Sequence, residues 1–152
     1  MTAPTTPPGG DVHDNTLDDY HVAIAHPTTL HREQGPVRNY SHQFSHYVNL
    51  LETPHPDGGL FQTFGLPPWT HLLVWPDQRM GLLEFLPHEL NRCSLQLRLF
   101  SSPNDGNHDG DDDAIEAWLQ QLLTFLAEDR RLIESAQRGY STGFVPGPAH
   151  RL

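Results

Sequence analysis

Residues 71–100 read HLLVWPDQRMGLLEFLPHELNRCSLQLRLF, and the patterning of this stretch decides the fold. We predict three β-strands in it, at residues 71–75, 80–86 and 93–100. In the last of these, leucines at every second position alternate with mostly polar residues, which is typical of a strand with one buried face. The connections between the strands are short, and short connections favour an antiparallel meander.

A long helix is predicted after the strands, at residues 113–137. Asp113, followed three residues later by Glu116, forms a variant of the capping box that starts helices. One stripe of side chains recurs at helical spacing and is expected to pack on the sheet. The stripe consists of Ile115, Trp118, Leu119, Leu122, Leu126, Asp129 and Ile133.

Asp129 is the exception in this stripe, because an aspartate is rare on an apolar face. Burying an unpaired carboxylate is costly, so Asp129 must be paired, protonated or bound to a metal. Its candidate protein partners are Arg130, Arg131 or a histidine of the core. A rotated helix that exposes Asp129 to solvent is the remaining alternative.

The N-terminal part of the chain is expected to contribute one short helix. Residues 1–12 are rich in Thr, Pro and Gly and are expected to be a disordered tail or a severed linker. A helix is predicted at residues 14–25, capped by Asp14 or Asn15 and ended by Pro27.

The middle of the chain carries weaker signals. Residues 28–70 are predicted to be irregular, with a strand or a short helix at 42–51. Turns are predicted at the glycines 58–59 and at the prolines 67–68. Antiparallel strands followed by one long helix predict an α+β fold, formed by a domain at residues 13–152.

Composition excludes several classes of partner and site. A formal net charge of -10 argues against binding to nucleic acid or to an anionic membrane, since both require basic patches. The single cysteine, Cys93, excludes an internal disulfide and a Cys-based metal cluster, and it favours the reducing cytoplasm. No apolar run approaches the ~20 residues of a membrane span, and residues 1–10 do not resemble a signal peptide.

Residues 15–27, NTLDDYHVAIAHP, concentrate side chains that can bind a metal. A carboxylate with two histidines and open coordination positions is the ligand set of non-haem Fe(II) sites. Asp18 and His21 are three residues apart and share one face of a helix. His21 and His26 are five apart, about 140° around an ideal helix. Both can reach one metal only if the last helical turn opens, which the following proline favours.

Other histidine pairs compete with this one. The chain has eleven histidines, so close pairs are expected by chance. His26 and His31 repeat the same spacing, and His42 and His46 form the i, i+4 pair that a regular helix presents to zinc. Sequence spacing does not choose between these three pairs.

Residues 14–27 resemble the iron-binding motif in the α-subunits of Rieske non-haem iron ring-hydroxylating oxygenases. That motif reads roughly Glu-Asn-x-x-(Glu/Asp)-x-Tyr-His-x4-His-Pro. Residues 128–139, EDRRLIESAQRG, look like the family's Glu-Asp-x-x-(Ile/Val)-x-Glu-x-x-Gln-x-Gly segment, whose Asp is the third iron ligand. The two motifs occur in the family's order, and the similarity covers about residues 13–150.

The resemblance implies a role for each matching residue. His21, His26 and Asp129 would form the facial triad that holds a mononuclear Fe(II). Asp18 would be the bridging carboxylate that carries electrons to the iron from the Rieske cluster of a neighbouring subunit. The remaining implied positions are Asn15, near the iron, and Tyr20, in the pocket wall.

The implied activity is O₂-dependent hydroxylation of a small organic substrate, catalysed by a helix-grip domain in which a curved antiparallel sheet wraps a long C-terminal helix. The implied partners are a Rieske-bearing subunit or domain, a reductase or ferredoxin, and further copies of the chain in a homotrimer. With Cys93 as its only cysteine, this chain cannot hold the [2Fe–2S] cluster, so electrons must arrive in trans. Asp14 also replaces the usual glutamate. We therefore expect an incomplete catalytic domain, from a split subunit, a gene fragment or a degenerate relative.

Two alternatives remain open. The first is a non-catalytic remnant, or partner-binding fragment, of the same fold. The second is a calcium-binding module, because residues 105–116 fit the calcium-loop pattern Asp-x-Asn-x-Asp-Gly-x5-Glu. A solvated acidic loop that caps the following helix explains the same residues without a metal.

Overall fold

The computed structural model describes residues 21–89, 92–101, 111–140 and 142. Several predictions lie outside these ranges. They concern the tail at 1–12, most of the helix predicted at 14–25, the first part of the 105–116 loop, and the residues Asn15, Asp18 and Tyr20. None of the helices in the described ranges is both long enough and apolar enough to cross a membrane.

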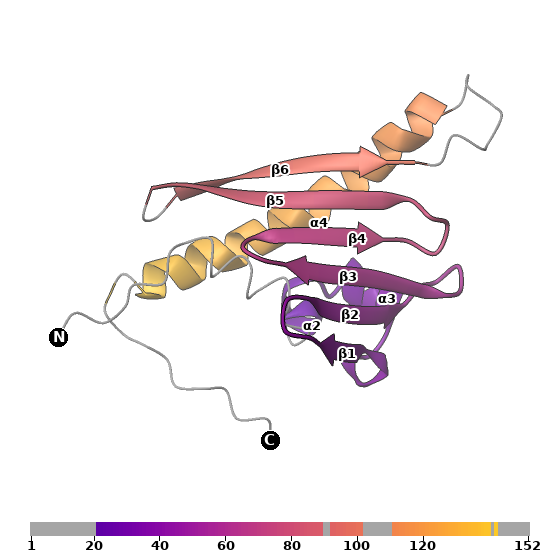
Figure 1. Ribbon diagram of the computed structural model, residues 1–152, viewed down its shortest axis with the longest axis horizontal. Helices are drawn as coiled ribbons and strands as arrows, with labels where there is room; N and C mark the ends of the chain where they lie inside the picture. The colour runs from indigo at the N-terminus through magenta and orange to yellow at the C-terminus, as the bar shows by residue number, and fades with distance from the viewer. Residues whose placement is uncertain (1–20, 90–91, 102–110, 141, 143–152) are drawn as a thin grey trace.

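One antiparallel sheet of six strands forms the body of the fold, and its strands lie side by side in chain order. All the labelled helices lie on one face of this sheet (Figure 1). The predicted α+β helix-grip architecture is therefore confirmed. The strands are β1 (Ser41–Phe44), β2 (Asn49–Pro54), β3 (Leu60–Leu66), β4 (Thr70–Val74), β5 (Met80–Glu89) and β6 (Arg92–Phe100). The helices are α2 (Val22–Ala25), α3 (Leu30–Gln34), the 3-10 helix η1 (Val37–Asn39) and α4 (Asp111–Tyr140).

The three strands predicted from residues 71–100 are confirmed as β4, β5 and β6, with ends shifted by at most three residues. The predicted long helix is confirmed as α4, which extends beyond both predicted ends. Turns occur at both predicted places, around residues 58–59 and 67–68.

The prediction that residues 28–70 are irregular is wrong, because they contain α3, η1 and the strands β1 to β3. The stretch 42–51 is neither one strand nor a helix: it spans the end of β1, a turn and the start of β2. The physical reason is visible in β3, whose core-facing positions are Phe61, Thr63 and Gly65. A threonine and a glycine on the buried face remove the hydrophobic alternation by which strands are recognised.

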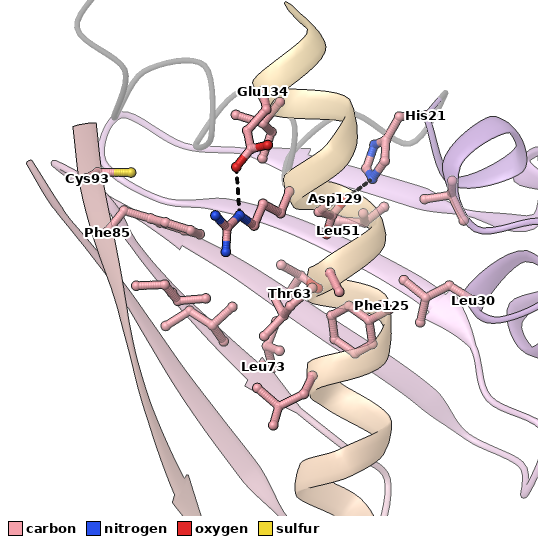
Figure 2. A pocket seen from close by; sticks show the side chains of 18 of the residues that line it. His21, Leu30, Leu51, Thr63, Leu73, Phe85, Cys93, Phe125, Asp129 and Glu134 are labelled. Carbon is pink, nitrogen blue, oxygen red and sulfur yellow. Dashed lines mark hydrogen bonds and ion pairs between the residues drawn. The ribbon is translucent and has the colours of Figure 1, made fainter. Parts of the chain in front are cut away.

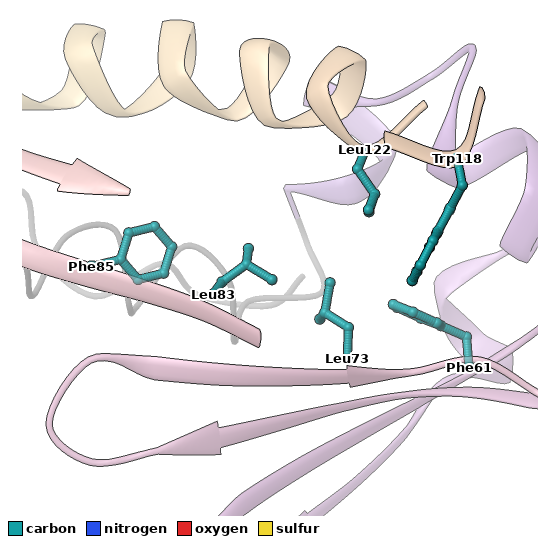
Figure 3. Packing of buried hydrophobic residues seen from close by; sticks show 6 residues of the cluster. All are labelled: Phe61, Leu73, Leu83, Phe85, Trp118 and Leu122. Atoms are coloured by element: carbon teal, nitrogen blue, oxygen red, sulfur yellow. The ribbon is translucent and has the colours of Figure 1, made fainter. Parts of the chain in front are cut away.

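The hydrophobic core joins the sheet to the first half of α4 (Figure 3). Phe61, Leu73, Leu83 and Phe85 project from the sheet toward the helix. Trp118 and Leu122 of the predicted helical stripe are buried against them, which confirms the orientation of that stripe.

A cavity of about 870 Å³ lies between the second half of α4 and the concave face of the sheet (Figure 2). Its size is within the range of small-molecule sites, roughly 300–1,000 Å³. Apolar side chains such as Leu73, Leu83 and Phe125 dominate its wall. His21 and Asp129, two of the predicted metal ligands, line the same space.

Candidate metal centre

The short helix α2 explains how two histidines five residues apart can converge. His21 accepts the first helical hydrogen bond from the amide of Ala25, and the helix ends at Ala25. His26 then leaves the helical conformation, with φ -121 and ψ 44. The expected opening of the last turn is therefore present, and the two imidazole rings lie 5.3 Å apart, edge to face.

Asp129 reaches both histidines from α4, the helix that forms one wall of the cavity. Its Oδ1 lies 2.9 Å from Nε2 of His26 and 3.4 Å from Nε2 of His21. The three side chains offer one ligand atom each, and these atoms lie within 4.8 Å of one another. Within the described residues, no other group of three His, Cys, Asp or Glu side chains converges in this way.

The competing arrangements do not assemble. His42, on β1, is half-buried and stacks on Phe44, whereas His46, just after β1, is exposed and packs against Tyr47. Arg130, one candidate partner of Asp129, instead donates to Glu134 at 2.7 Å. Among the candidate partners of Asp129, the histidines His21 and His26 are therefore the ones that contact it.

The electrostatics of the cluster favour a cation at its centre. Burial raises the pKa of Asp129, but hydrogen bonds from His21 and His26 outweigh burial and lower this pKa from 3.8 to about 2. Burial likewise lowers the pKa of His26, but Asp129 and Glu128 outweigh it and raise this pKa above 6.5. In the protein without metal, the raised pKa of His26 favours positive charge at the place where a metal ion would supply it.

Glu128 is a functional candidate to which our interpretation of the sequence assigned no role. Its Oε2 accepts a hydrogen bond of 2.7 Å from Nδ1 of His26 and another of 2.7 Å from the hydroxyl of Thr29. Because Nδ1 is occupied in this way, Nε2 is the nitrogen of His26 that is directed at Asp129. Metal-binding histidines commonly carry such a carboxylate on their second nitrogen. The signal was available, because Glu128 belongs to the quoted motif.

The structure does not place the remaining predicted site residues at the metal centre. Asn15, Asp18 and Tyr20 lie outside them. Residues 105–110 of the calcium-like loop also lie outside, and residues 111–116 form the first part of α4. There, an Oε1 of Glu116 accepts a hydrogen bond from Gln120.

Comparison with known proteins defines the class of this fold and site. The family model described as "Ring hydroxylating alpha subunit (catalytic domain)" matches residues 12–151. The chain therefore belongs to the family of catalytic domains of ring-hydroxylating oxygenase α-subunits.

A solved structure supports the same conclusion. The crystal structure of the quaternary ammonium Rieske monooxygenase CntA in complex with an inhibitor is similar, with a TM-score of 0.67 and 26% sequence identity. The match covers 91% of this chain but only 37% of the CntA chain, so this chain spans little more than a third of that protein's length. A comparison with curated proteins finds no match.

Proposed function

We propose that residues 13–152 form a mononuclear Fe(II)-binding catalytic domain that hydroxylates a small organic substrate with O₂. The observation that carries the proposal is the convergence of His21, His26 and Asp129 at the wall of a mostly apolar cavity. Family membership supports the oxygenase class, and the ligand set supports the choice of metal.

The donor chemistry fits a non-haem iron ion. Two imidazole nitrogens and one carboxylate leave further coordination positions open, which matches a facial triad. Fe(II) held there would supply the activation of O₂ that a hydroxylation requires. Zinc accepts the same donors, so the test below measures which metal is bound.

The chain's own residues prepare the site for this chemistry. Asp129 is held as a carboxylate by the two histidines, so its charge is available at neutral pH. Glu128, itself hydrogen-bonded by Thr29, holds His26 in one ring orientation, which reduces the entropy that must be lost when a metal binds. Leu83 and Phe125 belong to the apolar cavity wall that would surround the reacting part of the substrate and exclude water.

Electrons would come from outside this chain. We propose a Rieske-bearing subunit or domain as their immediate source, itself reduced by a reductase or ferredoxin. Asp18, three residues before His21 in the sequence, would be the bridging carboxylate, with Asn15 and Tyr20 completing the surroundings of the iron. A homotrimer in the cytoplasm is the proposed setting, because neighbouring copies of a longer or split α-subunit could then supply the cluster.

The experiment is a metal measurement on the full chain, purified without oxygen and reconstituted with Fe(II). Wild type should retain close to one iron per chain, whereas His21→Ala, His26→Ala and Asp129→Ala should each lose most of it. His46→Ala is the matched control, because His46 is an exposed histidine away from the cluster. Unchanged iron in all three cluster variants would contradict the proposal. Iron binding without turnover, when Rieske partner and reductase are added, would indicate a non-catalytic remnant.

A further inference from the structure

Two threonines lie on the floor of the cavity, where the core of a sheet usually carries apolar side chains. Thr53 is on β2 and Thr63 is on β3, and both line the cavity with 2% and 5% of their surface exposed. Thr63 pairs across the strands with Leu51 and Leu73. Figure 2 shows Thr63 between Leu51 and Leu73 and beside Phe125 of α4.

These hydroxyls are not used by the fold. The Oγ1 atom of Thr53 is buried and has no hydrogen-bond partner among the described residues. Within the same part of the chain, no hydrogen bond engages the hydroxyl of Thr63. A buried hydroxyl without a partner is unfavourable, whereas valine of the same shape would avoid this cost. The hydroxyls of Thr53 and Thr63, on neighbouring strands, therefore point to a partner that the described residues do not provide.

The buried polar side chains of the cavity lining are uncharged. The third buried polar side chain of the lining is Gln34 of α3, which accepts a hydrogen bond of 3.3 Å from Tyr40. The three arginines of the lining are exposed instead: Arg92 and Arg130 show 71% and 78% of their side-chain surface, and Arg138 is exposed as well. A charged ligand group would lose its hydration at the floor. The carboxylates of the lining are already paired, Asp129 with His21 and His26, and Glu134 with Arg130.

We propose that Thr53 and Thr63, together with Gln34, form a subsite for an uncharged hydrogen-bonding group of an otherwise apolar ligand. A hydroxyl, carbonyl or ether oxygen satisfies these hydroxyls, and a quaternary ammonium group, which neither donates nor accepts, does not. The identification of this ligand as the substrate rests on the proposed function, since His21 and Asp129 line the same cavity. The ligand class is thus an apolar ring or chain that carries one neutral oxygen function.

The test uses p-cresol and p-xylene, two probes that differ only by a hydroxyl in place of a methyl group. Each is titrated into the full chain without metal, and binding is followed by NMR chemical shifts. Wild type should bind p-cresol about five- to tenfold more tightly than p-xylene, as expected for one or two net hydrogen bonds. Benzyltrimethylammonium, as the cationic probe, should bind more weakly than p-cresol.

The variants Thr53→Val and Thr63→Val keep the shape of the floor and remove its hydroxyls. Together they should abolish the preference for p-cresol, leave p-xylene binding within twofold of wild type, and leave the Tm unchanged or raised. Thr63→Ser should keep the preference. Thr70→Val is the matched control, because Thr70 is on β4 at a position that alternates with the buried His71 and Leu73 and so faces away from the cavity.

Three results would overturn the inference. The first is no saturable binding of p-cresol, and the second is a preference for p-cresol that survives in the double valine variant. The third is a lowered Tm in the valine variants, because it would mean that the hydroxyls serve the fold, through bound water for example. Fe(II) affinity is measured on the same proteins and should not change in the threonine variants. A failure of the metal centre would instead appear in the His21, His26 and Asp129 variants, independently of the probe results.

Discussion

Replacing Asp129 by asparagine should destabilise the metal-free protein by about 2 kcal/mol at pH 5.5. The substitution keeps the shape of the side chain and removes the charge that binds the two histidines. The folded protein lowers the pKa of Asp129 from 3.8 to about 2. At about 1.4 kcal/mol for each pH unit, this difference corresponds to about 2 kcal/mol of folding free energy.

The sign and the pH window follow from this pKa. Because the pKa of Asp129 is lower in the folded state, its stabilisation is fully present above the unfolded value near 3.8. It is lost as the pH falls through the folded value. The difference between wild type and Asp129→Asn should therefore be about 2 kcal/mol at pH 5.5 and about 1 kcal/mol near pH 3.

Urea denaturation at several pH values, with a chelator present, measures this difference. Asp57→Asn is the matched control, because Asp57 also lies beside a histidine, at 3.7 Å from His55, but its side chain is 88% exposed. That exposed pair should contribute less than about 0.5 kcal/mol. A difference for Asp129→Asn that does not vary with pH, or that is no larger than the control, would refute the reasoning.

Three further results are expected. Glu128→Gln should weaken Fe(II) binding about 10- to 100-fold, measured by competition with a chelator, because the carboxylate that orients His26 is lost. Since the folded state raises the pKa of His26, metal-free stability should be highest below pH 6.5 and should decrease as the pH rises through the folded value, which thermal unfolding from pH 6 to 9 will show. Leu122→Ala should cost about 2–5 kcal/mol in urea unfolding because Leu122 is fully buried, while Leu123→Ala, at an exposed neighbouring position, should cost about 1 kcal/mol or less.

The elements that could be predicted from the sequence are those with a repeating pattern of apolar residues along the chain. The strands β4 to β6 have alternating or continuous apolar residues and short turns, and each of these signals depends only on neighbours in the chain. The α4 stripe is equally local, and it identified Asp129 as a carboxylate on a face that should be apolar. The strands β2 and β3 escaped prediction because Thr53 and Thr63 occupy core-facing positions. The cavity explains that choice of residue, since a threonine hydroxyl there can face a ligand.

The sequence by itself determined which side chains are available to the site, their order in two motifs and the family to which the chain belongs. It did not determine which histidine pair is used, because His21 and His26, His26 and His31, and His42 and His46 have equally suitable spacings. Only the tertiary structure decided between them, because α4 brings Asp129 against His21 and His26 across more than a hundred residues of chain. The same packing added Glu128, whose hydrogen bonds with His26 and with Thr29 no local period encodes.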